Sequence, residues 1–434
     1  MKILIVSQYW FPEEGVPQRR WTWLSELLVT EGHELMVVAP PSNHLRKRSW
    51  KNWINSKGYR SHREASLGPS GELIVRSGYV PAYGSLTMKA LNQATVAIGA
   101  IGAIYKRRGP IGSWTPDLVV GTVPALPTAL VAYLAAKKFG IPYVIDLRDA
   151  WPDLLAQSDK WNAGLDKKSI REKLLNFGLT DLIVATAERV LNSIINGARS
   201  LVVTSEHLGD AFRRQFGVEH DDPRVVTVRN VFPRGGLLNS HTEGHKIMEP
   251  HVSLRVLYAG TVGRAQDLKN AVKAVHLARF RGVPVEMKIV GSGDALQAVK
   301  NYSSSLGTAI TFHDRVTLNE MNGFYDWADT ALVHLTDWEP LQRAVPSKTY
   351  EVMERGLHIT AVANGETSEL VDSLQAGHSV PPSNPQDLAE LWELLFQDPE
   401  LLVPSKYARD WVEQQRQDTR QLLQKVTKWC ADAK

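Results

Sequence analysis

Short apolar runs alternate with longer amphipathic segments along most of the chain. In the first half, such runs occupy residues 3–6, 34–38, 73–75, 118–120, 143–147, 201–203 and 225–228. The pattern then restarts, with runs at residues 255–258, 285–290, 310–312, 331–335 and 359–362. Short buried strands separated by helices are typical of parallel sheets that are covered by helices on both faces. The sequence therefore predicts an α/β protein with two parallel sheets.

A boundary between the two halves is indicated by residues 232–253, which are rich in Gly, Pro, His and other polar residues and lack a period. We therefore predict a first domain at residues 1–232, a linker at 233–253 and a second domain at 254–404. The last segment, 405–434, is expected to be a packing helix, because large apolar residues recur there at nearly helical spacing. These residues are Tyr407, Trp411, Leu422, Leu423, Val426 and Trp429.

The composition is that of a globular protein with substantial cores, since 43% of the 434 residues are hydrophobic. The single cysteine, Cys430, excludes an internal disulfide and a zinc site built from several cysteines, which fits a reducing compartment. The first six residues predict a strand rather than a signal peptide. The longest apolar stretch, residues 94–105, is shorter than the roughly 20 residues that span a bilayer. We expect a cytoplasmic protein.

Positive charge is unevenly distributed, although the net charge is only +4. The stretch from Arg46 to Arg63 contains no acidic residue and interleaves its basic residues with three aromatic ones. A second acid-free stretch, from Lys89 to Arg108, carries the apolar segment. Such surfaces suit anionic lipid headgroups or a lipid-phosphate acceptor, so we expect a peripheral position on the inner face of a membrane. A solvated loop is the alternative, and no nucleic-acid-binding motif accompanies the charge.

Residues 345–356 predict a loop that opens into a helix directly after a buried strand. Pro346 ends the strand, and Ser347 is a suitable N-cap for the helix. The unpaired amides of a first helical turn and the helix dipole attract anions, and Lys348 adds a positive charge there. Glu351, one turn further on, could accept hydrogen bonds from sugar hydroxyls. A capped surface helix is the alternative interpretation.

Glycine turns follow predicted strands at three places. Gly260 and Gly263 precede Arg264, so that backbone amides and a guanidinium could face a phosphate. Gly15 precedes Arg19 in the first half, and Gly291 follows another strand in the second. Each turn alone is weak evidence. Three turns at the same edge of two sheets, facing one cleft, are stronger evidence for a ligand site.

A polar cluster stands at the end of the fifth apolar run. Asp146, Arg148, Asp149 and Trp151 gather two carboxylates, a guanidinium and an indole beside a predicted core. An internal ion pair that closes the strand is one interpretation, and contact with an acceptor or donor sugar is the other. Thr122, at the end of the preceding strand, is expected to lie next to this cluster.

Several enzyme classes are disfavoured by missing motifs. No complete GxGxxG follows the first strand and no GxxxxGK[ST] occurs, which argues against dinucleotide oxidoreductases and phosphate-loop NTPases. His241 and His245 have the wrong order for an HExxH zinc site and fall in the linker. No Asp-x-Asp pair of the kind that holds a divalent ion on a nucleotide is present. The charge of a diphosphate would then be neutralised by Arg264, Lys348 and helix amides.

Taken together, these residues resemble the retaining family-4 glycosyltransferases of GT-B fold, especially those of bacterial surface-polysaccharide assembly. The resemblance covers nearly the whole chain. It rests on the first strand and turn ending in Arg19, Gly32-His33, Arg148-Asp149-Ala150-Trp151-Pro152, Val228-Arg229-Asn230, and residues 260–268, 290–293 and 345–356.

The resemblance implies two Rossmann-like domains that face a cleft, with the C-terminal helix packing back on the first domain. The second domain would hold most of a nucleotide-sugar donor, and the first domain would hold the acceptor. Donor-binding residues would be Gly15, Gly260, Gly263, Arg264, Gly291, Pro346, Ser347, Lys348 and Glu351, with Glu351 on the ribose. Acceptor-binding residues would be Arg19, Arg148, Asp149 and Trp151.

Three positions depart from the family pattern. Arg343 stands where the first of two family glutamates is expected. Residues 265–267 lack the lysine that many relatives carry after the glycine-arginine turn, and Lys269 or Lys348 would have to replace it. Thr122 and the two residues after it stand where some members carry a histidine. The contacts to the sugar-phosphate are therefore left open.

These patterns predict a metal-independent, cofactor-free retaining glycosyltransferase that moves a sugar from a nucleotide-diphosphate sugar, with UDP expected, to a lipid-linked or glycan acceptor. Arg264, Lys348 and Asp149 are the candidate catalytic residues. Retention would follow from attack on the face from which the diphosphate departs, with the leaving phosphate taking the acceptor's proton. The alternatives are a nucleotide-sugar epimerase of the same architecture and a non-catalytic protein that binds sugar nucleotides.

Overall fold

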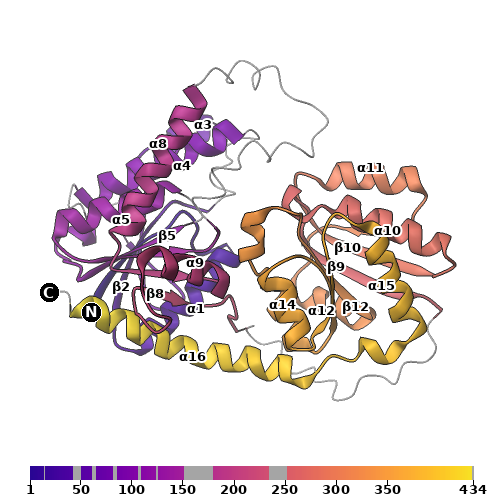
Figure 1. The fold of residues 1–434 in the computed structure, drawn as a ribbon. Coiled ribbons are helices and arrows are strands. Elements are labelled where there is room, and N and C mark those ends of the chain that lie inside the picture. Colours follow the sequence, from indigo (N-terminus) through magenta and orange to yellow (C-terminus); the bar gives the residue numbers. More distant parts are fainter. Residues whose placement is uncertain are drawn as a thin grey trace.

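Two α/β units lie side by side in the computed structural model, one from each half of the chain (Figure 1). The structure describes residues 1–13, 15–42, 50–60, 65–81, 86–105, 109–123, 126–150, 179–233 and 252–432. The predicted linker therefore lies almost wholly outside the described residues, together with His241 and His245. The division of the chain at residues 232, 253 and 404 stays a prediction.

The first sheet has β1 at its centre and is parallel except for β3 at one edge. Its order is β3 (Ala65–Leu67), β4 (Leu73–Arg76), β2 (Glu34–Ala39), β1 (Lys2–Val6), β5 (Leu118–Val123), β6 (Tyr143–Leu147), β7 (Ser200–Val203) and β8 (Val225–Thr227). Its helices are α1 (Val16–Thr30), α3 (Trp50–Asn55), α4 (Leu86–Tyr105), α5 (Leu126–Phe139), α8 (Leu179–Asn196) and α9 (Glu206–Phe216). Strand β3 was not predicted, because its three residues form no apolar run.

The second sheet is parallel throughout its described strands. Its order is β11 (Ile310–His313), β10 (Val285–Ser292), β9 (Leu254–Thr261), β12 (Thr330–His334), β13 (His358–Val362) and β14 (Gly377–Val380). Its helices are α10 (Leu268–Phe280), α11 (Leu296–Leu306), α12 (Leu318–Trp327), α13 (Ser347–Arg355), α14 (Glu366–Ser373) and α15 (Pro385–Gln397). In this sheet, every predicted apolar run forms a strand, and the weakly apolar β14 is the one described strand that was not predicted.

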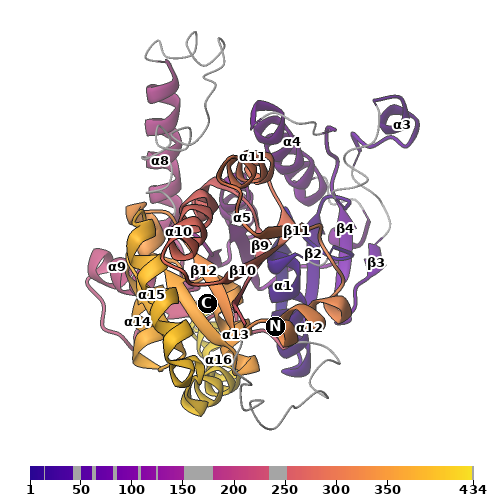
Figure 2. The ribbon, with the colours of Figure 1, turned by 90° about the vertical axis from the view of Figure 1, so that its right-hand side faces the viewer.

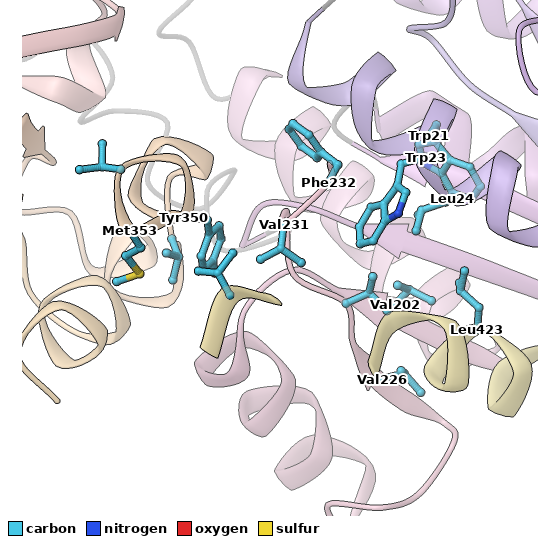
Figure 3. Close-up of a cluster of buried hydrophobic side chains, with 14 of the residues drawn as sticks. Trp21, Trp23, Leu24, Val202, Val226, Val231, Phe232, Tyr350, Met353 and Leu423 are labelled. Carbon is cyan, nitrogen blue, oxygen red and sulfur yellow. The ribbon is translucent and has the colours of Figure 1, made fainter. Parts of the chain in front are cut away.

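The central strands are buried on both faces, as their continuous apolar runs predict. Ile3 and Ile5 of β1 pack into one core, whereas Leu4 and Val6 pack into another. The first of these cores continues through Val231 and Phe232 into the second domain, where Tyr350 and Met353 of α13 join it (Figure 3). The two units therefore share a hydrophobic core at the point where the chain passes between them.

Helix α16 (Lys406–Ala431) runs from the second unit back along the first (Figure 1), and Figure 2 views this helix nearly end-on. It packs on α13 near its start, and near its end Trp429 Nε1 donates to the Arg199 carbonyl at 3.0 Å. The Arg199 guanidinium lies 3.4 Å from the centre of the Trp429 ring. The predicted return of the C-terminal helix to the first domain is confirmed. None of the described helices is both long and apolar enough to cross a bilayer.

Candidate functional site

Helix α13 begins at the carboxyl edge of the second sheet, shortly after β12. Pro346, with φ −58°, is the residue before the helix, and Ser347 is its first helical residue. The prediction that Ser347 is the N-cap is therefore wrong by one residue, because the chain already turns helical at Ser347. No side chain caps this helix start. Its first amides and the helix dipole consequently favour an anion in front of them.

Lys348 and Glu351 are joined to Tyr325 of α12 in a closed triangle of polar contacts. Lys348 Nζ lies 2.8 Å from Glu351 Oε2 and donates to the Tyr325 hydroxyl at 3.3 Å. The Tyr325 hydroxyl in turn donates to Glu351 Oε1 at 2.7 Å. Each carboxylate oxygen can accept a second hydrogen bond, so these contacts orient Glu351 and leave it able to accept hydrogen bonds from a ligand. Tyr325 was not predicted, because nothing in its local pattern distinguishes it from a core aromatic residue.

A hollow between the two units adjoins this helix start, with about 370 Å³ of space when the open solvent at its mouth is included. It is lined by residues of α1, residues 230–232, α13 and α16: Val16, Arg19, Asn230, Val231, Phe232, Ser347, Lys348, Tyr350, Glu351, Glu354, Val412 and Arg416. Arg19 lies with its guanidinium 4.7 Å from the centre of the Phe232 ring. The structure thus brings Arg19, predicted for the acceptor, into one hollow with Ser347, Lys348 and Glu351, which were predicted for the donor.

Arg264 begins a short 3₁₀ turn (Arg264–Gln266) directly after β9. The Gly263 amide donates to Gln266 Oε1 at 3.2 Å, and the Thr336 amide donates to the Ala265 carbonyl at 2.9 Å. The second bond places the Arg264 turn beside the loop that leads from β12 to α13. Arg264 is half-buried there. The two predicted diphosphate-binding segments therefore share one edge of the second sheet.

Gly291 pairs with Gly260 across β10 and β9. Its φ is +149°, and a Cβ atom at this position would lie 1.8 Å from the Gly260 carbonyl oxygen. Glycine is therefore required at this position by strand packing, and this requirement needs no ligand. Gly15, at the N-terminus of α1, has an ordinary extended backbone, and its role in donor binding stays a prediction.

Asp146 belongs to the fold of the first domain. Arg20 of α1, fully buried, donates to Asp146 Oδ1 from Nη2 at 2.8 Å, and Trp21 Nε1 donates to Oδ2 at 2.8 Å. Arg20 also donates to the carbonyl of Val228 at 2.8 Å. The internal ion pair considered for this cluster is present, but its cation is Arg20 rather than the adjacent Arg148. A charged residue on the apolar face of α1 is the sequence signal that could have revealed it.

Arg148 and Asp149 follow β6 at the carboxyl edge of the first sheet, and both are half-buried. The Arg148 amide donates to the Val123 carbonyl at 3.2 Å, and the Thr204 hydroxyl donates to the Arg148 carbonyl at 3.0 Å. Burial lowers the pKa of the Arg148 guanidinium, against the opposing effect of neighbouring carboxylates. Trp151, the fourth residue predicted for the acceptor, lies outside the described residues.

A buried network connects the two units beside this site. Arg229 donates to Glu366 Oε1 at 2.5 Å and to the Tyr350 hydroxyl at 3.1 Å. Glu366 also accepts the backbone amides of Glu206 and His207, at 2.9 and 2.7 Å, at the start of α9. Glu366 was missed because its partners are more than 130 positions away in the sequence.

The basic stretches are described only in part. Helix α3 exposes Trp50 and Ile54, and Trp53 contacts the rings of Trp50 and Tyr59 edge-on. Arg46 and Arg63 lie outside the described residues. Helix α4 carries exposed Leu91, Ile98 and Tyr105. In the described part of the chain, no group of three or more His, Cys, Asp or Glu residues is placed to hold a metal ion.

Two facing Rossmann-like units, joined by a C-terminal helix that returns to the first, define the GT-B class of glycosyltransferases. The sequence matches two family models, "Glycosyl transferase 4-like domain" over residues 15–230 and "Glycosyl transferases group 1" over residues 253–398. The chain belongs to the GT4 family of glycosyltransferases.

Three proteins that this chain resembles are between 14% and 23% identical to it. WcaI of Escherichia coli (strain K12), whose name describes it as a colanic acid biosynthesis glycosyl transferase, is 23% identical to this chain. The match covers 86% of this chain and 86% of WcaI. A sucrose-phosphate synthase from Thermosynechococcus elongatus has a TM-score of 0.65 at 14% identity and covers 100% of both chains. HepE from Anabaena, solved with UDP-glucose, has a TM-score of 0.61 at 14% identity over 99% of this chain and 100% of its own. These structures establish the shared fold.

Proposed function

We propose that this protein is a retaining glycosyltransferase that transfers a sugar from a nucleotide-diphosphate sugar, with UDP as the nucleotide, to a lipid-linked or glycan acceptor in cell-surface polysaccharide synthesis. The observation that carries the donor part is the uncapped start of α13 with Lys348 and Glu351, beside a hollow between the two domains. HepE, which shares the fold, was solved with UDP-glucose, and the name of WcaI places it in colanic acid biosynthesis.

In the proposed reaction, the diphosphate lies against Arg264, Lys348 and the first amides of α13. The acceptor hydroxyl attacks the anomeric carbon from the face on which the bond to the diphosphate breaks, and the leaving phosphate oxygen takes the hydroxyl proton. The protein's main contribution is then to stabilise the negative charge that develops on the leaving group. The two cations and the helix amides supply the positive charge and the donors that compensate it, which is why we include metal independence in the proposal.

For the ribose, Glu351 is the proposed partner. Lys348 and Tyr325 each hold one oxygen of its carboxylate, and the remaining lone pairs can accept bonds from the two ribose hydroxyls. The acceptor would approach from the first domain, where Arg148 and Asp149 lie at the carboxyl edge of its sheet.

A peripheral membrane position is part of the proposal. Exposed Trp50 and Tyr59 near α3, and Ile98 on α4, belong to the acid-free stretches, and their aromatic and apolar side chains suit a headgroup region. Co-sedimentation with vesicles tests this directly. We expect more protein on vesicles containing anionic lipid than on neutral ones, and equal binding to both would remove the membrane argument.

The proposed reaction is tested by mass spectrometry of products formed from a panel of nucleotide sugars and a polyprenyl-diphosphate-linked sugar. The proposal predicts one acceptor product with a single added sugar, with the anomeric configuration of the donor retained in its NMR spectrum. Transfer should persist in the presence of EDTA. Release of an epimerised sugar nucleotide without acceptor, or inversion of the anomeric centre, would contradict it.

A further inference from the structure

We propose that Arg148 binds an anionic phosphate group of the acceptor, so that the acceptor is a phosphate- or diphosphate-linked molecule rather than a neutral glycan. This inference rests on the proposed function and specifies its acceptor. The observation behind it is a guanidinium whose hydrogen-bonding groups are only partly used.

The Nε and Nη2 atoms of Arg148 are buried and have no hydrogen-bond partner among the described residues. A buried guanidinium donor that lacks an acceptor is costly, since it has lost water without gaining a replacement. These two atoms can form the parallel pair of bonds that a phosphate or carboxylate accepts. An anion that reaches these two atoms would therefore find a pair of donors without acceptors among the described residues.

The carboxylate of Asp146, two residues before Arg148, cannot serve as that partner. Asp146 directs its oxygens to Arg20 and Trp21, at 2.8 Å each, on the face of the sheet that α1 covers. Asp149 and Asp146 both favour the charged form of Arg148 electrostatically, and Tyr9 lies close enough to contribute as well, whereas Arg20 opposes it. Among the described residues, two donors of this guanidinium therefore have no acceptor, although neighbouring carboxylates favour its charged form.

The backbone of Arg148 is fixed on both sides. Its amide is held by β5 through Val123, and its carbonyl is held by the hydroxyl of Thr204 after β7. The residue after Thr204, Ser205, donates to the carbonyl of Arg343 in the second domain. Arg148 therefore stands at the strand ends that face the second domain, which is where an acceptor must approach the donor.

Phosphate is favoured over a peptide or sugar carboxylate by the expected acceptor chemistry. A sugar carried on an isoprenoid diphosphate presents its phosphates next to the sugar that receives the new bond, and a guanidinium binds such a group with two parallel hydrogen bonds. Free inorganic phosphate offers the same chemistry. The experiment must therefore separate a lipid-linked phosphate from a free one.

The test measures binding of a short-chain isoprenyl diphosphate by calorimetry, with saturating UDP present to fill the donor site. Wild type, Arg148→Gln and Arg148→Lys are compared, with Arg214→Gln, an exposed arginine of α9, as the matched control. We expect Arg148→Gln to weaken binding by about ten-fold or more, Arg148→Lys to restore it only in part, and the control to bind as the wild type does. Binding of the uncharged isoprenyl alcohol should be the same in the wild type and the Arg148 variants. Inorganic phosphate should bind more weakly than the isoprenyl diphosphate.

Two further readouts separate this role from a structural one and from failure of the proposed function. In transfer assays, Arg148→Gln should raise KM for the diphosphate-linked acceptor and leave KM for the donor nearly unchanged. Its melting temperature should not fall, because the substitution removes a charge two of whose buried donors have no acceptor in the described part of the chain. Equal isoprenyl diphosphate binding by wild type and Arg148→Gln would overturn the inference, as would a clear drop in melting temperature with unchanged acceptor KM. If no nucleotide sugar supports transfer by the wild type, the proposed function fails while the binding measurement still decides the inference.

Discussion

Arg229 and Glu366 form a buried ion pair between the two domains, with Arg229 Nη1 2.5 Å from Glu366 Oε1. Glu366 additionally accepts two amides at the start of α9, so one carboxylate joins a helix N-terminus of each domain. The contact fixes the first domain relative to α14 directly beside the hollow at α13.

Glu366→Gln should therefore destabilise the protein strongly. The substitution leaves Arg229 buried without its carboxylate, and breaking a buried pair from one side costs about 3–5 kcal/mol. Denaturant titration checks the loss in the free energy of unfolding. Glu369→Gln is the control, because Glu369 pairs with His207 while 63% of its side chain is exposed. That change should cost less than about 1 kcal/mol.

Asp146→Asn should mainly reduce stability, whereas Asp149→Asn should mainly reduce the rate of transfer. Asp146 is the partner of the fully buried Arg20, so its substitution should lower the free energy of unfolding by roughly 3 kcal/mol or more. Asp149 is half-buried at the edge of the sheet, and its substitution should reduce the transfer rate with little effect on stability. Denaturant titration and a transfer assay on both variants separate the two roles. Equal loss of stability would show that both carboxylates are structural.

Gly291→Ala should disrupt the pairing of β10 with β9 near the carboxyl ends of these strands. The added methyl group would overlap the Gly260 carbonyl, and the positive φ is strained for alanine. Gly323→Ala, in α12, is the matched control because a Cβ atom there meets nothing within 4 Å. In thermal unfolding, the melting temperature of Gly291→Ala should be far below that of the wild type. The melting temperature of Gly323→Ala should be unchanged or slightly higher, because replacing a glycine within a helix by alanine stabilises by up to about 0.5–1 kcal/mol. Similar melting temperatures for the two variants would refute the packing argument.

Acid should destabilise the second domain through two buried histidines. Burial lowers the pKa of His334 and of His358 to about 3, so both stay neutral in the folded protein. In the unfolded chain they bind protons below about pH 6.5, and stability therefore falls as the pH decreases from that value toward 3. Each contributes a loss of about 1.4 kcal/mol per pH unit in this window. His334→Gln should make the loss between about pH 7 and about pH 5 shallower, and an unchanged slope would contradict the assignment.

The periodic parts of the fold could be predicted from the sequence, because strands buried on both faces require continuous apolar runs. Strands β3 and β14 were missed, since these two edge strands are partly exposed and carry no such run. The position of α13 and the presence of Lys348 and Glu351 on it followed from turn and helix signals within a few residues.

Contacts between distant residues could not be predicted in this way. The pairing of Asp146 with Arg20, of Glu366 with Arg229 and of Glu351 with Tyr325 depends on which elements the fold brings together. Local patterns hold no information about that choice. For the same reason the sequence could not show that Arg19, predicted for the acceptor, lies in one hollow with Lys348, and the role of Arg19 stays a prediction.

The start of α13 is the nucleotide site on which the proposed reaction depends, and calorimetric titration with UDP tests this assignment most directly. GDP and dTDP serve as comparison ligands, and Lys406→Ala, at the start of α16, is the control for loss of a lysine. We expect UDP to bind the wild type and the control equally, and to bind Lys348→Ala at least about ten-fold more weakly, as expected when a charge contact to a phosphate is lost. UDP binding by Lys348→Ala with wild-type affinity would contradict the assignment of the nucleotide site to the start of α13.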